Sequence, residues 1–165
     1  MKKIILITGG QRSGKSTKAE ELALQLSANP VYLATAHIWD DEFRDRVRKH
    51  QERRGLEWTN IEEEVQLSKH NLAGRVVVID CITLWLTNWL QVNDNPLDQA
   101  KAEFDQFTTP DATYIFVTNE IGSGGTSTNA LQRRFTDLQG WMNQYIAQKA
   151  DEVILMISGI PVKIK

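Results

Sequence analysis

A glycine-rich segment directly follows the first apolar run of the chain and constrains the fold more than any other feature. The apolar run KIILIT covers residues 3–8, and the segment GGQRSGKST follows it at residues 9–17. The segment satisfies the spacing GxxxxGK[ST], which places a tight loop between a buried strand and the first turn of a helix. We therefore expect the chain to begin with a strand–loop–helix unit of a parallel α/β sheet.

The residue types in this loop suit the binding of phosphate groups. Gly9 and Gly14 let the backbone curl so that successive amide groups point toward phosphate oxygens. Lys15 would neutralise the charge of the β- and γ-phosphates, and the Ser16 hydroxyl would bind Mg²⁺ at the helix N-terminus. We predict that the whole loop contacts a nucleotide, through Gly9, Gly10, Gln11, Arg12, Ser13, Gly14, Lys15 and Ser16.

Four further apolar runs follow, and their composition indicates buried parallel strands. They cover residues 31–35, 75–80, 113–118 and 152–158 and are almost continuously apolar. Such runs are typical of parallel strands that helices cover on both faces, and the intervening segments are long enough for crossover helices. A length of 165 residues suits one domain. We predict a single P-loop NTPase-like domain over residues 1–165, an α/β three-layer fold with a mostly parallel central sheet.

Apolar periodicity and end signals predict the helices between these strands. In one segment, Thr59 and Glu62 match a capping box, which predicts a helix after Thr59. The other predicted helices cover residues 15–27, 40–54, 81–91, 97–107 and 129–149.

All five predicted strands end in small or polar residues, and one of these ends is an acid. Asp80 follows four apolar residues, and Asn119 with Glu120 follows the next run. Because ligands of open parallel sheets bind at the carboxyl edge, this rim is the expected active face. We predict that Asp80 coordinates Mg²⁺ together with Ser16. The alternative is that Asp80 caps the following helix, and both roles are compatible.

Composition and missing motifs exclude several classes of protein. Nineteen basic and twenty-one acidic residues give a net charge of −2, which argues against nonspecific nucleic-acid binding. The lone cysteine, Cys81, cannot form an internal disulfide, and the first apolar run is too short for a membrane span or signal peptide, so we expect a cytoplasmic protein. Neither DxxG nor NKxD follows the later strands, which argues against a guanine-nucleotide switch. A compact nucleotide-dependent kinase or transferase remains.

The predicted helix 40–54 carries a histidine in an unusual setting. Trp39, Phe43 and Val47 are spaced by four residues, and His50 continues their stripe. This spacing predicts that the His50 side chain points toward the body of the protein, where a neutral imidazole could attack phosphorus. Spacing by itself favours a packing role for His50. The following residues, Arg53 and Arg54, could bind phosphates in a bidentate manner.

Taken in order, the motifs resemble those of the bacterial adenosylcobinamide kinase / adenosylcobinamide-phosphate guanylyltransferase family of cobalamin biosynthesis. The resemblance covers essentially the whole chain. It rests on GGQRSGKST, YLATA with DDEF, RVRKHQERR with EWTNIEE, DCITLWLTN, VTNEIG, and RRFTDLQGWMNQ followed by ADEVILMISGIPVKIK. A phosphate loop is generic, whereas the ordered set is specific.

The resemblance implies a bifunctional, Mg²⁺-dependent enzyme that is a homotrimer. It would phosphorylate adenosylcobinamide with ATP or GTP and then transfer GMP from GTP to adenosylcobinamide phosphate through a GMP-histidine intermediate, giving adenosylcobinamide-GDP and pyrophosphate. The histidine corresponds to His50, which with Lys15 would be catalytic. Further nucleotide contacts map onto Ala34, Thr35, Ala36, Gln51, Glu52, Arg53, Arg54, Glu62 and Asp80.

The sequence departs from the family pattern at two places, and two other interpretations compete with this resemblance. Gly55 replaces the proline that commonly follows the arginine, and residues 122–129 differ from the loop common in relatives. One competing interpretation is a P-loop kinase of another small metabolite, in which His50 only packs. The other is a binding module that holds GTP or ATP without turning it over.

Overall fold

The computed structural model describes residues 1–52 and 54–165, except for the side chains of residues 46 and 50. Within that part of the chain, one sheet of seven strands has the order β3-β2-β4-β5-β1-β6-β7. All neighbouring strands are parallel except β6 and β7, which are antiparallel. The strands are β1 Lys3–Gly9, β2 Val31–Ala34, β3 Thr59–Glu62, β4 Val76–Asp80, β5 Thr113–Val117, β6 Glu152–Ile157 and β7 Ile160–Lys163.

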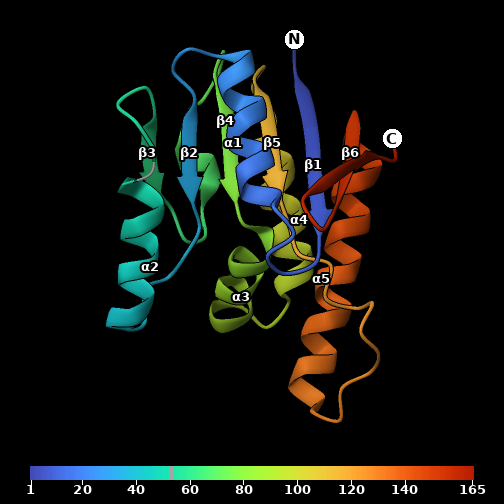
Figure 1. Cartoon of the computed structure of the whole chain (residues 1–165). Coiled ribbons are helices and arrows are strands. Elements are labelled where there is room, and N and C mark those ends of the chain that lie inside the picture. Colours follow the sequence, from blue (N-terminus) through green and yellow to red (C-terminus); the bar gives the residue numbers. More distant parts are fainter. Residues whose placement is uncertain (53) are drawn as a thin grey trace.

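Helices cover both faces of this sheet, which confirms the predicted three-layer α/β fold (Figure 1). The alternation of side chains along β1 shows the division. Ile4 and Leu6 pack with residues of α3, α4 and α5, whereas Ile5 and Ile7 pack on the other face with Ala19 of α1. The helices are α1 Lys15–Leu26, α2 Asp41–Glu52, α3 Ile82–Val92, α4 Pro96–Phe107 and α5 Ala130–Lys149, with a short 3₁₀ turn at Leu67–Lys69.

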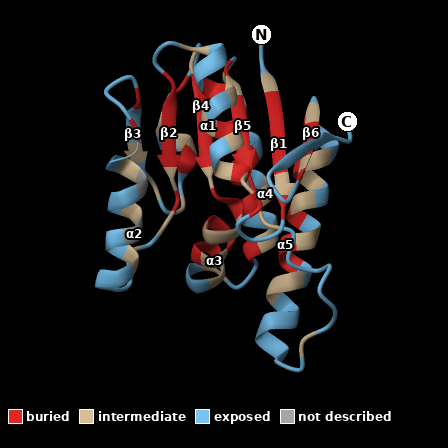
Figure 2. Ribbon diagram, in the orientation of Figure 1, coloured by how far each residue is buried: buried red, intermediate tan, exposed pale blue. Residues whose placement is uncertain are grey.

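The central strands are buried along most of their length, as continuous apolar runs require (Figure 2). The five strands predicted from such runs correspond to β1, β2, β4, β5 and β6. The structure adds β3 and β7 at the two edges of the sheet. Both are short and mostly exposed, so they lack the apolar signal that identifies a buried strand.

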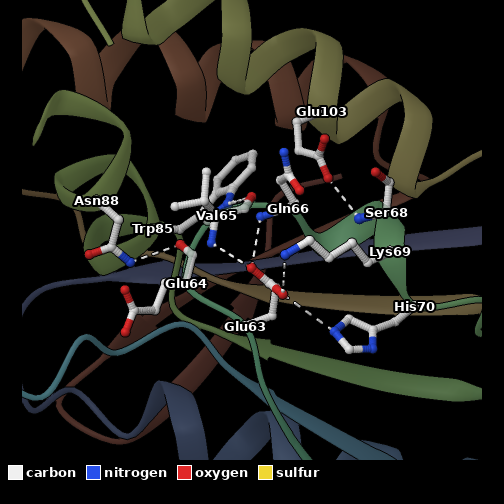
Figure 3. A network of polar contacts seen from close by, with 10 residues as sticks. All are labelled: Glu63, Glu64, Val65, Gln66, Ser68, Lys69, His70, Trp85, Asn88 and Glu103. Carbon is white, nitrogen blue, oxygen red and sulfur yellow. Dashed lines mark hydrogen bonds and ion pairs between the residues drawn. The ribbon is translucent and has the colours of Figure 1, made fainter. Parts of the chain in front are cut away.

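The prediction of a helix after Thr59 is wrong, because Thr59–Glu62 forms β3 beside β2. The Thr59 amide donates to the Pro30 carbonyl at 3.0 Å, and the Thr59 hydroxyl donates to Asn29 at 3.1 Å, so this hydroxyl does not cap a helix. The carboxylate that accepts backbone amides here is Glu63, at 3.1 Å from Val65 N and 3.0 Å from Gln66 N (Figure 3). The TxxE pattern therefore lies one residue before a turn rather than at a helix start.

The segment after β3 is fastened to the helices on one face of the sheet (Figure 3). The indole N–H of the fully buried Trp85 donates to the Val65 carbonyl at 2.8 Å. The Asn88 amide donates to the Glu64 carbonyl at 2.8 Å, and the Ser68 amide donates to Glu103 at 2.7 Å. These contacts join α3 and α4 to the chain that leads from the edge strand back into the core.

The hairpin of β6 and β7 meets the phosphate loop. Its turn residues Ser158 and Gly159 both have positive φ angles, 52° and 81°. The Gly159 amide donates to the Ser13 carbonyl at 3.0 Å, which joins the two turns. Elsewhere, none of the helices that the structure describes is long and apolar enough to cross a membrane.

Candidate active site

A cavity of about 490 Å³ opens at the carboxyl ends of the central strands, the edge where the sequence predicts ligand binding. The phosphate loop forms one wall, and α2 and the beginning of α3 provide apolar side chains. The lining residues are Gln11, Arg12, Ser13, Gly14, Lys15, Ser16, Thr17, Tyr32, Ala34, Ala36, Phe43, Val47, Arg54, Asp80, Cys81, Leu84, Val117 and Asn119. The cavity lining therefore combines the polar groups of the phosphate loop with apolar side chains of α2 and α3.

Two glycines of the loop occupy positions that other residues could not take without strain. Gly14, the N-cap of α1, has a φ of 91° in the left-handed region. Gly9 has a φ of 152°, and a Cβ atom there would lie 2.5 Å from the Met156 carbonyl oxygen. The loop thus approaches β6 too closely for a side chain at Gly9, and this approach shapes the loop around the cavity.

Lys15 lines the cavity and is only 7 % exposed. Its ammonium group donates to the Gly10 carbonyl at 2.5 Å. Burial lowers the pKa of Lys15, and the nearby negative charge of Asp80 offsets part of this effect. The Gly10 carbonyl thus holds the ammonium group of Lys15 within the loop that lines the cavity.

Asp80 ends β4 beside the loop and is held by a tyrosine from β2. The Tyr32 hydroxyl donates to one carboxylate oxygen of Asp80 at 2.7 Å. Burial and the adjacent Asp80 charge raise the pKa of Tyr32 well above its ordinary value, so the hydroxyl keeps its proton. The alternative that Asp80 caps the following helix is wrong, because the Cys81 sulfur accepts the Leu84 amide of α3 at 3.5 Å.

The donor set at this end of the cavity fits Mg²⁺. Ser16 and Asp80 both line the cavity, and only one Asp80 oxygen takes part in the bond from Tyr32. Over the described residues, no cluster of three or more acidic, histidine or cysteine side chains is present. Mg²⁺ is commonly held by one or two protein oxygens together with phosphates and water, so a site of this composition suits it.

The three residues expected to contact nucleotide after β2 take two different positions. Ala34 and Ala36 line the cavity, whereas Thr35 is fully buried outside its lining. The Thr35 hydroxyl donates to the Cys81 carbonyl at 2.8 Å and accepts the Cys81 amide at 2.9 Å. The Asn88 amide donates to the Thr35 carbonyl at 2.8 Å. Thr35 therefore braces the cavity wall.

Arg54 is brought to the cavity but is already engaged by protein groups. Its side chain is 2 % exposed, lies 3.5 Å over the Tyr32 ring, and donates to Asn60 at 3.0 Å. One guanidinium nitrogen is 3.6 Å from Glu20. Arg54 thus links α1, β2 and β3 beside the cavity, and any contact with phosphate would add to these interactions.

The remaining predicted residues of α2 and β3 lie outside the cavity lining or outside the described part. Gln51 donates to Glu62 at 2.9 Å, which ties the end of α2 to β3. Glu52 forms an exposed ion pair with Arg48 at 3.6 Å. Arg53 and the side chain of His50 lie outside the described residues. Helix α2 itself reaches the cavity through Phe43 and Val47.

Three residues that line the cavity were not predicted from the sequence, namely Tyr32, Leu84 and Cys81. The hydroxyl of Tyr32 within an aliphatic strand was the available signal, because a buried tyrosine hydroxyl requires a partner. Asn119 was noted only as a polar strand end, and it lines the cavity together with the phosphate loop and Asp80. Leu84 and Cys81 carry no such signal.

Comparisons with known proteins identify the family. The family model "Cobinamide kinase / cobinamide phosphate guanyltransferase" matches residues 5–164. The chain is 37 % identical to the bifunctional adenosylcobalamin biosynthesis protein CobP of Pseudomonas aeruginosa, over 97 % of this chain and 96 % of that protein. It is 36 % identical to the bifunctional adenosylcobalamin biosynthesis protein CobU of Escherichia coli strain K12, over 98 % and 99 %.

A solved structure supports the fold. The flagellar accessory protein FlaH from Methanocaldococcus jannaschii superposes with a TM-score of 0.51 at 17 % identity, over 99 % of this chain and 78 % of that one. At this identity the likeness concerns the fold. With the family model and two relatives that match over nearly their full length, the chain belongs to the cobinamide kinase / cobinamide phosphate guanyltransferase family of enzymes.

Proposed function

We propose that one nucleotide site serves two successive reactions, with His50 as the residue that carries GMP. In the first, adenosylcobinamide is phosphorylated by ATP or GTP. In the second, GMP passes from GTP to adenosylcobinamide phosphate, which gives adenosylcobinamide-GDP and pyrophosphate. The observation that carries the proposal is that the phosphate loop, Asp80 and helix α2 line the same cavity.

In the kinase reaction the protein positions the triphosphate and stabilises its charge. The corrinoid hydroxyl oxygen attacks the γ-phosphorus and releases its proton to water, and the bond to the leaving nucleoside diphosphate breaks. Lys15 and the loop amides stabilise the negative charge that develops on the phosphate oxygens. Ser16 and Asp80 would hold Mg²⁺, which would supply further charge neutralisation at the phosphates.

In the guanylyl transfer, covalent catalysis divides one displacement into two. An imidazole nitrogen of His50 forms a bond to the α-phosphorus of GTP, and pyrophosphate leaves. A phosphate oxygen of adenosylcobinamide phosphate then attacks the same phosphorus and displaces the histidine. The support for His50 is its place on α2, three residues after Val47, because Val47 and Phe43 of this helix line the cavity.

The state of assembly and the location of the protein also remain proposals. By resemblance we expect a homotrimer in the cytoplasm. Trp39 and Trp141 are 49 % and 54 % exposed, and large apolar side chains at the surface are compatible with contacts between subunits.

The two reactions can be separated with one pair of variants. Lys15→Ala should impair both reactions, because the same lysine neutralises the triphosphate in each. His50→Ala should abolish guanylyl transfer and retain phosphorylation of adenosylcobinamide. Circular dichroism and thermal unfolding establish that each variant folds, and GTP binding is a further check for His50→Ala.

Other outcomes would favour the competing interpretations. Equal loss of both reactions in a folded His50→Ala variant would contradict the division of roles. Turnover with a different acceptor, and none with adenosylcobinamide, would indicate a kinase of another metabolite. Tight nucleotide binding without any product would indicate a binding module.

A further inference from the structure

Asn119 follows β5. This strand lies between β1, which leads into the phosphate loop, and β4, which ends at Asp80. β5 pairs with β1 and β4, and Val117 is in register with both Ile7 and Asp80. Asn119, two residues farther on, lines the same cavity as Lys15 and Asp80. Over the described part of the chain, its side-chain amide has no hydrogen-bond partner.

The backbone of Asn119 is held from two sides by side chains. Its amide donates to the hydroxyl of Thr83, in the first turn of α3, at 3.1 Å. Its carbonyl accepts the side-chain amide of Asn143, from α5, at 3.2 Å. The next residue, Glu120, donates its backbone amide to the Gly9 carbonyl of the phosphate loop at 2.9 Å. The position of Asn119 is thereby fixed relative to the loop.

Hydrogen bonds among the side chains of Thr118, Gln139 and Asn143 support the backbone at Asn119. The Thr118 hydroxyl donates to the side-chain oxygen of Asn143 at 2.7 Å, and the side-chain amide of Gln139 donates to the Thr118 hydroxyl and to the same Asn143 oxygen, both at 2.9 Å. Thr118 and Gln139 are 0 % and 1 % exposed, and the side-chain oxygen of Gln139 has no hydrogen-bond partner among the described residues. Burying amides costs stability unless their hydrogen bonds are made, so apolar residues would stabilise a purely structural contact better.

We propose that the side-chain amide of Asn119 donates a hydrogen bond to the terminal phosphoryl group of the bound nucleoside triphosphate. Thr118, Gln139 and Asn143 act as positioning residues, because they hold the backbone from which this amide projects. The charge of the phosphoryl group increases the strength of such a bond. The contact exists only for a triphosphate, so Asn119 distinguishes triphosphate from diphosphate and orients the group that is transferred in the kinase reaction.

The first test measures binding without any corrinoid. The affinities of the protein for ADP and for a non-hydrolysable ATP analogue are compared by calorimetry in the presence of Mg²⁺. In Asn119→Ala the preference for the triphosphate should fall about 10- to 100-fold, the effect of one hydrogen bond to a charged group. Asn119→Asp, which has nearly the same shape, should reduce the preference for the triphosphate at least as much, because its carboxylate cannot donate a hydrogen bond and repels the negatively charged phosphate. The control is Asn71→Ala in an exposed turn.

The second test separates positioning from general stability. Gln139→Met keeps the length of the side chain but removes its hydrogen bonds to Thr118 and Asn143. We expect a several-fold lower kcat for phosphoryl transfer with an unchanged affinity for ADP. A lower melting temperature with an unchanged kcat would show that Gln139 has only a structural role and would overturn its assignment.

The inference rests on the proposed function for the reaction in which Asn119 acts, but the binding test does not depend on it. An unchanged ratio of the two affinities in Asn119→Ala and Asn119→Asp would overturn the inference. A reduced ratio in an enzyme that leaves adenosylcobinamide unmodified would support the inference while refuting the proposed kinase reaction. The two failures are therefore distinguishable.

Discussion

Removal of one hydroxyl group, in Tyr32→Phe, tests how the protein holds Asp80 at the cavity. The ring of Tyr32 is buried, and its hydroxyl donates to Asp80 at 2.7 Å. A hydrogen bond to a charged group contributes about 1.5–3 kcal/mol. Asp80 is only half-buried, so water can replace the hydroxyl, and we expect the lower end of this range. Tyr32→Phe should therefore lower the free energy of unfolding by about 1.5 kcal/mol, and the melting temperature by about 3–6 °C in a chain of this size.

A second substitution measures the contribution of the ring. Tyr32→Leu also loses the surface under Arg54, whose guanidinium lies 3.5 Å from the ring centroid, and the edge contact with Trp58. A desolvated cation–π contact contributes about 2 kcal/mol and an aromatic pair about 1 kcal/mol. Together with the lost hydroxyl, we expect a total loss of about 4.5 kcal/mol for Tyr32→Leu.

The assay is urea unfolding followed by tryptophan fluorescence, at pH 7 and without nucleotide. The pKa of Tyr32 is raised in the folded state. The protonated hydroxyl therefore contributes its full stabilisation below the unfolded pKa of about 10, and this stabilisation is lost as the pH rises above that value toward the folded pKa. The difference between wild type and Tyr32→Phe should therefore narrow in alkaline solution. A Tyr32→Phe variant as stable as wild type at pH 7 would refute the reasoning about Asp80.

Three further predictions address the loop, the core and the β6–β7 edge. Gly9→Ala should abolish nucleotide binding in calorimetry, because its Cβ would lie 2.5 Å from the Met156 carbonyl. Trp85→Phe should cost about 2–4 kcal/mol in urea unfolding, because it leaves a cavity and a Val65 carbonyl without its donor. Hydrogen bonds from Lys3 and Lys163 lower the pKa of Glu152. The ionised carboxylate therefore stabilises the fold above a pH of about 4.5, and this stabilisation is lost as the pH falls through the folded pKa. In Glu152→Gln, the free energy of unfolding should fall less steeply with decreasing pH in acid.

Each of these predictions has a matched control or a contradicting result. Gly10→Ala, where a Cβ meets nothing within 4 Å, should leave the loop intact; equal effects of both glycine substitutions would contradict the close-approach argument. Trp141→Phe at an exposed position should change stability by less than about 0.5 kcal/mol. If the free energy of unfolding of Glu152→Gln fell with decreasing pH as steeply as that of wild type, the lysine contacts would contribute nothing to stability.

The sequence predicted the parts of the fold whose signals are local. The loop spacing and the continuous apolar runs identified the parallel core and the carboxyl edge, and the helix that begins after Asn129 is confirmed with the Asn129 side chain as its cap. The edge strands β3 and β7 were missed, because their residues remain exposed and carry no apolar run. For β3 the pairing partner, β2, also lies far away in the sequence. At Thr59, pairing with β2 prevailed over a local capping pattern.

The sequence predicted that residues of the phosphate loop and Asp80 lie together, but it did not predict the contacts that support them. Lys15, Ser16 and Asp80 do line one cavity, as spacing and strand ends indicated. Motif mapping gave no means to separate Thr35, which braces the wall, from the alanines beside it that line the cavity. Such a distinction depends on the direction of a side chain at a strand end and on its distant partners, Cys81 and Asn88.

The central claim is that His50 carries GMP during the transfer. The most direct measurement is to incubate the protein with Mg²⁺ and GTP labelled at the α-phosphate, denature it, and map the retained label by mass spectrometry, with His50→Ala and Lys15→Ala in parallel. We predict an acid-labile, base-stable adduct of GMP on the peptide that contains His50, and no label in His50→Ala. No adduct on folded wild-type protein that binds GTP, or an adduct on another residue, would contradict the claim.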